Sequence, residues 1–179
     1  WQGIISMRGA ITILILAWII STVVSEMHTG EYLSTLVAGN IHAGFLPVIL
    51  FLLAGVMAFA TGTSWGTFGI MLPIAAAMAV KVEPSLIIPC MSAVMAGAVF
   101  GDHCSPISDT TILSSTGAHC NHIDHVTSQF PYALTVAASA ATGYLALGMT
   151  GSAPLGFVVT GIVMVVLIFI LKDKKKATA

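Results

Sequence analysis

The stretch FGDHCSPISD (residues 100–109) governs the interpretation of the whole sequence, because it places two carboxylates inside an otherwise apolar chain. Of the 179 residues, 57% are hydrophobic and 7% are charged, whereas soluble domains usually carry about 25% charged residues. No Asp, Glu, Lys or Arg occurs in 32–80, 84–101 or 125–171. Apolar runs of this length are typical of transmembrane helices. The sequence therefore predicts an integral membrane protein.

The remaining composition excludes two other classes of protein. The formal net charge of -1 gives no reason to expect a nucleic-acid partner. Cys90, Cys104 and Cys120 are odd in number and show no paired CxxC spacing, so we expect no disulfide framework.

The chain opens without an initiator methionine or a signal-peptide n-region, and we expect it to be a single transmembrane domain fragment (1–179) of a longer protein.

Apolar segments predict an all-α polytopic membrane protein. The predicted segments are 9–24, 45–60, 68–80, 85–118, 127–149 and 155–171. The segment 45–60 would be only about 24 Å long at 1.5 Å per residue, which is shorter than a hydrocarbon core of about 30 Å. The polar stretch TGTSWGT (61–67) separates it from the still shorter 68–80. Two short arms around a Gly/Thr tip favour a re-entrant hairpin, lined by protein or a water-filled cavity.

The stretch GDHCSP interrupts the apolar segment 85–118. Gly101 is a typical C′ residue for a helix that ends at Phe100. Ser105 followed by Pro106 has the signature of an N-cap and first helical residue, which predicts a second helix from Ile107. The segment is therefore predicted to be one discontinuous transmembrane helix. Such helices commonly form ion sites near the bilayer midplane in secondary transporters.

The two interruptions supply oxygen atoms for a cation. Asp102 is expected in the gap of the broken helix and Asp109 in the first turns of its second half, where the helix dipole favours a negative charge. Ser108, Thr111 and Ser115 stand at i, i+3 and i+7, so they can share one helix face. Carboxylate, hydroxyl and carbonyl oxygens suit Na+ rather than a soft metal. The candidate cation- and proton-binding residues are Asp102, Asp109, Ser105, Ser108, Thr110, Thr111, Thr61, Thr63, Ser64 and Thr67.

Each of these assignments has a structural alternative. Asp109 could be a helix N-terminal charge stabilised only by the dipole, and Asp102 a cap at an aqueous interface. The Gly, Ser and Thr residues of 61–67 could serve close helix packing. A charge at the bilayer centre costs at least about 2.5–3.5 kcal/mol on insertion scales, so its retention favours a functional role. A carboxylate that binds either Na+ or a proton is sufficient for exchange.

The histidines admit several interpretations. The stretch HCNHIDH (119–125) could be a solvated loop, a zinc site or a pH-sensing segment. His103 lies beside Asp102 and could modulate that carboxylate, relay protons or make a structural hydrogen bond. We expect a solvated loop at 119–125, no metal site beyond transported Na+, and no cofactor.

The charge distribution predicts the orientation of the chain. Lys172, Lys174, Lys175 and Lys176 place the C-terminus in the cytoplasm by the positive-inside rule. Counting back through the segments puts 119–125 in the cytoplasm, Lys81 and Glu83 outside, and Arg8 in the cytoplasm. The basic Arg8 therefore lies on the side that the positive-inside rule favours.

Three stretches together resemble the NhaC-type Na+/H+ antiporter family: TGTSWGTFGIMLPIA (61–75), GDHCSPISDTTILSSTGA (101–118) and NHIDHVTSQFPYA (121–133). The resemblance implies secondary active exchange of Na+ for H+ in the bacterial cytoplasmic membrane, and pH homeostasis. It also implies membership of the ion-transporter superfamily, with this chain as the C-terminal inverted repeat. Its expected partners are membrane lipids, Na+, H+ and the N-terminal half of the same transporter. A homodimer stays an open alternative.

Relatives that exchange malate or lactate with coupled Na+ and H+ leave organic-acid antiport as an alternative. An enzyme is not expected: GDHCSP lacks the G-x-S-x-G elbow of a serine hydrolase. No base is clearly placed to activate a serine, so no catalytic residue is assigned. A membrane-embedded hydrolase or metal-binding protein is the remaining alternative hypothesis.

Overall fold

The computed structural model describes residues 42–177 together with Ile15, Ile19, Thr22, Val23, Glu26, Met27 and Tyr32. The predicted span 9–24 lies largely outside the described residues. The elements from residue 42 onward are η1 (Ala43–Phe45), α3 (Leu46–Thr61), α4 (Ser64–Val82), η2 (Pro84–Leu86), α5 (Ile87–Cys104), α6 (Asp109–Gly117), α7 (His122–Thr150) and α8 (Ala153–Ala177). Within the described ranges there is no strand, and five helices are long and apolar enough to cross a membrane. The prediction of an all-helical, multi-pass protein is confirmed.

Helices α3 and α4 are longer than the sequence predicted. With η1, the first forms a 19-residue apolar span, and α4 begins at Ser64 rather than Phe68 and also has 19 residues. Gly62 ends α3 in the left-handed conformation (φ 68°), and the Thr63 side chain caps α4 by accepting from the Gly66 amide. The break is therefore only two residues long. At about 28 Å each, the two arms no longer favour a re-entrant hairpin over two full spans.

Helix α5 does not end at Phe100 as predicted, but continues through Gly101 and Asp102 to Cys104. Gly97 and Gly101 instead permit close packing against α3. A Cβ atom on Gly97 would overlap the Phe51 carbonyl oxygen, and one on Gly101 would overlap the Gly55 carbonyl oxygen. Small residues four apart allow helix backbones to approach in this way. The glycine thus serves a tertiary contact, which outweighs its preference for a helix end.

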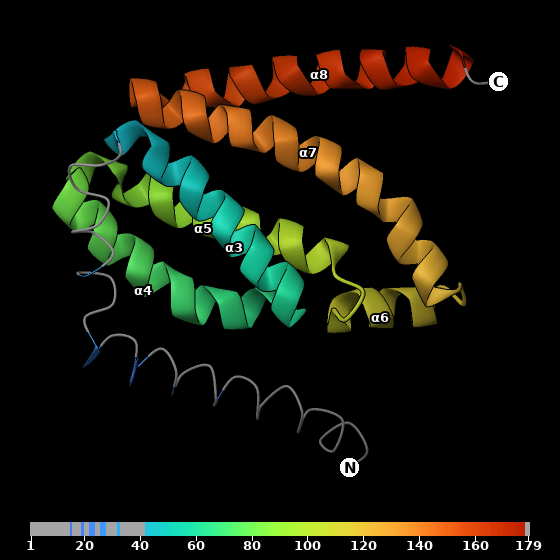
Figure 1. Cartoon of the computed structure of the whole chain (residues 1–179), viewed down its shortest axis with the longest axis horizontal. Helices are drawn as coiled ribbons and strands as arrows, with labels where there is room; N and C mark the ends of the chain where they lie inside the picture. Colours follow the sequence, from blue (N-terminus) through green and yellow to red (C-terminus); the bar gives the residue numbers. More distant parts are fainter. Residues whose placement is uncertain are drawn as a thin grey trace.

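The core lies between α3, α4 and α5. Figure 1 shows α3 crossing α5, with α4 along one side and α7 and α8 together on the other. The main buried cluster contains Leu46, Leu50, Ala54, Ala58, Met71, Ile74, Ala75, Met78, Ala79, Leu86, Cys90, Val94 and Ala98. A smaller cluster joins Phe51 to α7, where its ring centroid lies 5.5 Å from that of Tyr144.

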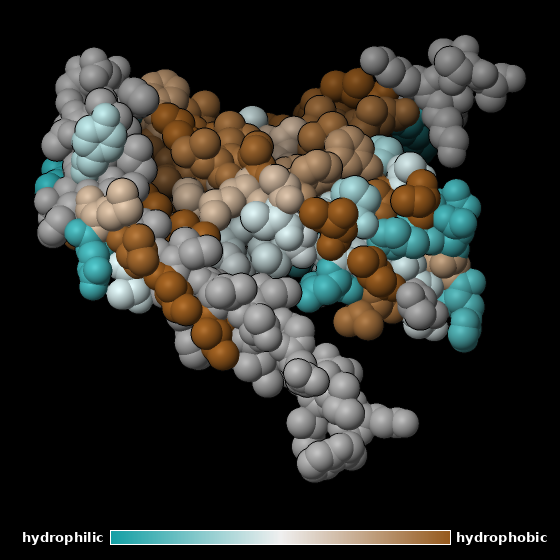
Figure 2. Space-filling model, turned by 60° about the horizontal axis from the view of Figure 1, so that its bottom comes forward, coloured by the Kyte–Doolittle hydropathy of each residue, from teal (hydrophilic) through white to brown (hydrophobic). Residues whose placement is uncertain are grey.

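The outer surface is strongly apolar. In α8 only 6% of the most hydrophobic window is buried within the described structure, and in α7 only 17%. Figure 2 shows hydrophilic residues gathered mostly toward two ends of the molecule, with hydrophobic surface between them. Such a surface is suited to lipid or to further protein and not to water.

Candidate functional site

The two breaks predicted from the sequence pack directly against one another. The Ser64 hydroxyl donates to Oδ2 of Asp102 at 3.2 Å, which links the start of α4 to the end of α5. The Ser105 hydroxyl donates to the carbonyl oxygen of Phe59 in α3 at 2.8 Å. A Cβ atom on Gly62 would lie 2.6 Å from the carbonyl oxygen of Ile107. Figure 1 shows the end of α3, the start of α4 and the end of α5 meeting in one region.

Asp102 is the buried carboxylate of this region. It lies in the last turn of α5 rather than in the gap, because α5 extends four residues further than the predicted end at Phe100. The side chain is 4% exposed. Among the described residues Oδ1 has no hydrogen-bond partner. A buried carboxylate oxygen without a partner is costly, which makes this atom the candidate ligand-accepting atom of the region.

Helix dipoles act on Asp102 from two directions. The carboxylate belongs to the C-terminal turn of α5, where the dipole disfavours a negative charge. Its hydrogen-bond donor Ser64 is the first residue of α4, whose positive N-terminal end favours that charge. The two contributions oppose each other, and no Lys or Arg side chain of the described residues pairs with Asp102.

The polar face predicted for this helix is present in α6, and the structure buries it. Ser108, Thr111 and Ser115 are buried, with exposures of 0%, 4% and 1%. Ser108, not Ser105, caps the helix: its hydroxyl oxygen accepts from the Thr111 amide at 3.3 Å and lies 2.8 Å from the Thr110 hydroxyl. The predicted helix start at Ile107 is therefore two residues early, and Ser105 instead caps the end of α5.

Asp109 occupies the first turn of α6, as predicted, but its environment differs from that of Asp102. It is exposed, and its Oδ1 accepts from the neighbouring Thr110 amide at 2.7 Å. Thr110 is exposed as well. Of the two predicted carboxylates, the structure therefore buries Asp102 and exposes Asp109.

The other hydroxyls of the first break bond within their own helices. Thr61 donates to the carbonyl oxygen of Met57 at 2.9 Å. Thr67, which is buried, donates to the carbonyl oxygen of Thr63 at 3.0 Å. Of the four predicted hydroxyl residues in 61–67, Ser64 is the one that the structure bonds to Asp102.

His103 makes no hydrogen bond to Asp102. Its Nδ1 lies 2.9 Å from the carbonyl oxygen of Val99, one turn earlier in α5, and the side chain is exposed. The same side chain lines a cavity of about 410 Å³ with Phe100 and Tyr132. Of the interpretations drawn from the sequence, this geometry fits the structural hydrogen bond.

The segment 119–125 is not a loop throughout, because α7 begins at His122. Asn121 caps this helix by accepting from the amides of Ile123 and Asp124. His122 bridges two elements: Nδ1 lies 3.2 Å from the Ser115 hydroxyl and Nε2 lies 2.7 Å from the carbonyl oxygen of Pro106. Sequence reasoning missed this residue, although the asparagine is a recognisable N-cap signal.

Zinc ligation finds no support in the described part of the chain. No three His, Cys, Asp or Glu side chains there are grouped so that they could hold a metal ion. The histidines of this segment differ instead in their contacts, since the ring of His122 has two partners and that of His125 has none among the described residues.

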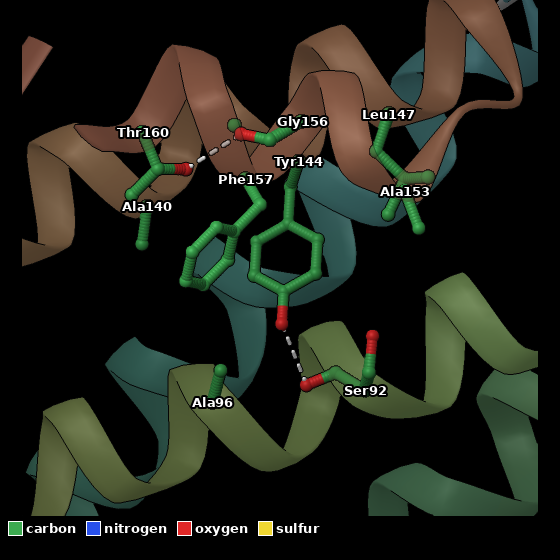
Figure 3. A pocket seen from close by; sticks show the side chains of 10 residues that line it. Ser92, Ala96, Ala140, Tyr144, Leu147, Ala153, Gly156, Phe157 and Thr160 are labelled. Carbon is green, nitrogen blue, oxygen red and sulfur yellow. Dashed lines mark hydrogen bonds between the residues drawn. The ribbon is translucent and has the colours of Figure 1, made fainter. Parts of the chain in front are cut away.

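A second cavity, of about 300 Å³, lies between α5, α7 and α8. Figure 3 shows the Tyr144 ring in this cavity, where its hydroxyl donates to the carbonyl oxygen of Ser92 at 3.0 Å. Ser92 precedes Asp102 by ten residues of helix, or about 15 Å. The cavity is therefore distinct from the region of the two breaks.

Comparison with known proteins places the chain in a family. The sequence profile described as the Na+/H+ antiporter family matches residues 1–149. The chain belongs to the Na+/H+ antiporter family. Membership indicates a transporter rather than an enzyme, and with the five apolar helices it indicates a multi-pass membrane protein.

Three relatives of this antiporter-family chain differ in what their names record. An uncharacterized protein of Haemophilus influenzae is 64% identical over 172 residues, which is 96% of this chain and 33% of the relative. A malate-2H+/Na+-lactate antiporter of Bacillus subtilis is 35% identical over 89 residues, covering 48% of this chain and 18% of the relative. An uncharacterized Na+/H+ antiporter of Haemophilus influenzae is 32% identical over 105 residues, covering 59% and 22%.

The chain thus spans about a third or less of the length of these relatives. No solved structure matches it.

Proposed function

We propose that this chain carries a site that exchanges Na+ for H+ across the bacterial cytoplasmic membrane, with Asp102 as the shared carboxylate. The observation that carries the proposal is the buried Oδ1 of Asp102, which has no partner among the described residues, at the meeting point of two helix breaks. Membership of the Na+/H+ antiporter family supports it.

The proposed exchange needs one carboxylate that is open first to one side of the membrane and then to the other. When Asp102 holds a proton, its charge is neutralised and Na+ is not retained. When the proton leaves, the carboxylate and nearby oxygens coordinate Na+. Ser64 holds the carboxylate in place through Oδ2 and leaves Oδ1 toward the ion. The further candidate ligands are Ser105, Ser108, Thr110, Thr111, Thr61, Thr63 and Thr67.

Asp109 has a second role in this proposal. From the exposed first turn of α6 it attracts Na+ toward the breaks and adds a carboxylate when the ion passes. Since its Oδ1 already accepts a backbone hydrogen bond, we assign the main ion-binding contribution to Asp102.

The proposed setting is an NhaC-type member of the ion-transporter superfamily. In it this chain forms the C-terminal inverted repeat, with the C-terminus in the cytoplasm, and 45–80 forms either a re-entrant hairpin or two full spans. An N-terminal half would complete the site, which is consistent with a chain about a third as long as its Haemophilus influenzae relative. Assembly as a homodimer is part of the same proposal.

The second candidate is Na+/H+-coupled exchange of organic acids. The name of the Bacillus subtilis relative, a malate-2H+/Na+-lactate antiporter, favours it. An anion needs a cationic or donor-rich clamp. From residue 42 to residue 172 the basic side chains are Lys81 and Lys172, together with histidines. We therefore rank simple cation exchange first.

Everted membrane vesicles that contain the full-length protein distinguish the two functions. After the proton gradient is formed, Na+ added as the salt of an impermeant anion is expected to dequench a pH-sensitive dye without malate or lactate. If dequenching requires one of these acids, and labelled acid moves with it, the second candidate is correct. If neither Na+ nor acid changes the signal, both are wrong.

A further inference from the structure

Helix α6 is held in place by polar contacts more than by apolar burial. Its apolar residues Ile112 and Leu113 are 43% and 70% exposed, whereas its buried side chains include Thr111 and Ser115. The helix packs on α7 and on the end of α5, and Figure 1 shows it beside the first turns of α7. Because little apolar surface is buried, individual hydrogen bonds determine where α6 lies.

His122 makes two of these hydrogen bonds from one ring. Nε2 lies 2.7 Å from the carbonyl oxygen of Pro106, in the break between α5 and α6. A carbonyl can only accept, so Nε2 must carry hydrogen and donate. Nδ1 lies 3.2 Å from the hydroxyl oxygen of Ser115, in the later part of α6, and this hydroxyl also donates to the carbonyl oxygen of Ile112 at 3.0 Å. One side chain of α7 thus contacts both the break before α6 and the later part of that helix.

The Pro106 carbonyl is the more consequential of the two partners. It lies between Ser105, which bonds to α3, and Ser108, which caps α6. Holding this carbonyl ties the backbone of the break to α7, in addition to its contact with α3. The break is therefore held between Phe59 in α3 and His122 in α7.

We infer that His122 is a positioning residue, which holds the α5–α6 break in the geometry that the ion site requires. The inference rests on the proposed function, because the break carries the site. His122 does not touch Asp102, so its effect is indirect. It acts through the position of the Pro106 carbonyl and of the buried hydroxyls Ser108 and Thr111.

Conservative substitutions separate the two hydrogen bonds of His122. In His122→Gln the amide nitrogen falls near the place of Nε2 and can still donate to Pro106. In His122→Asn the shorter side chain reaches toward Ser115 only, and His122→Ala loses both. His125→Ala is the matched control, since His125 lies in the same first turn of α7 and its ring has no hydrogen bond among the described residues.

The first measurement is Na+-induced dequenching by the full-length variants over a range of Na+ concentrations. His122→Ala and His122→Asn are expected to raise the half-saturating Na+ concentration about threefold to tenfold, the equivalent of one hydrogen bond. His122→Gln should restore most of the wild-type value, and His125→Ala should leave it unchanged. Equal impairment of the Gln and Asn variants, or an equal effect of His125→Ala, would overturn the inference.

The second measurement does not depend on transport. Hydrogen–deuterium exchange of the detergent-purified protein is followed in peptides that cover 105–117. His122→Ala and His122→Asn should exchange faster there than the wild type, and His122→Gln should not. If the wild type shows no Na+-dependent signal but the exchange pattern holds, the proposed function fails and the positioning role stands. Unchanged exchange in His122→Ala and His122→Asn would disprove that role.

Discussion

Replacing Asp102 by Asn tests the buried carboxylate most directly. The substitution keeps the size of the side chain and an acceptor for the Ser64 hydroxyl, which lies 3.2 Å from Oδ2. It removes the charge from a side chain that is 4% exposed and has no partner at Oδ1 among the described residues. Any loss of exchange would therefore come from the missing charge rather than from a cavity or a lost contact.

The expected magnitude follows from that environment. A contact to a charged group is worth about 1.5–3 kcal/mol net, so the apparent affinity for Na+ should fall about tenfold to 150-fold. The free energy of unfolding should stay unchanged or rise, because an unpaired buried charge is replaced by a neutral amide. Asp109→Asn is the matched control: an exposed charge contributes about 0.2–1 kcal/mol to an ion pair, so the affinity should fall no more than about fivefold.

The assay combines Na+-induced dequenching in everted vesicles with thermal unfolding of the purified full-length variants. Wild-type exchange by Asp102→Asn would refute the assignment of this residue. A marked loss of thermal stability would refute the reasoning as well, since it would mean that the carboxylate stabilises the fold. If Asp109→Asn impairs exchange more than Asp102→Asn, the order of importance proposed for the two carboxylates is wrong.

Three further predictions concern contacts of the described helices. Ser64→Ala removes the hydroxyl that holds Asp102, so we expect the half-saturating Na+ concentration to rise about threefold to tenfold; an unchanged value in the dequenching assay would contradict this role. Gly101→Ala places a methyl group against the α3 backbone and should destabilise the protein by about 1–3 kcal/mol in thermal unfolding, whereas Gly161→Ala, with open space around it, should not. Tyr144→Phe loses one hydrogen bond of 3.0 Å and should lower the free energy of unfolding by about 0.5–1.5 kcal/mol without changing Na+ dependence, and a changed Na+ dependence would mean that its cavity belongs to the site.

Local sequence signals predicted where the chain is interrupted. The glycine and hydroxyl residues of 61–67 and the serine–proline pair at 105–106 mark breaks because their capping and backbone preferences act over a few residues. The shared face of Ser108, Thr111 and Ser115 followed from helical periodicity alone, and the structure buries all three. Asp109 was placed correctly in the first turns of α6 from the serine–proline signature, although the predicted start at Ile107 was two residues early.

Other features depend on contacts that no local pattern records. Gly101 has the signal of a helix end, yet α5 continues because the glycine is needed where its backbone touches α3. His122 stood in a polar stretch that was expected to be a loop, and its partners Pro106 and Ser115 lie 16 and 7 residues away. The pairing of Ser64 with Asp102 spans 38 residues. Contacts between residues so far apart in the sequence can be identified only from the packing of the helices.

The glycine contacts between α3 and α5 limit how these two helices can move relative to each other. At Gly97 and Gly101 no side chain separates α5 from the carbonyl oxygens of α3, so neither helix can turn or slide on the other without a backbone collision. Each of the two helices ends at one of the breaks. Both breaks therefore lie at the ends of one closely packed helix pair, and we expect them to move together. In the proposed exchange, access to Asp102 from either side of the membrane would then change through movement of other elements relative to α3 and α5.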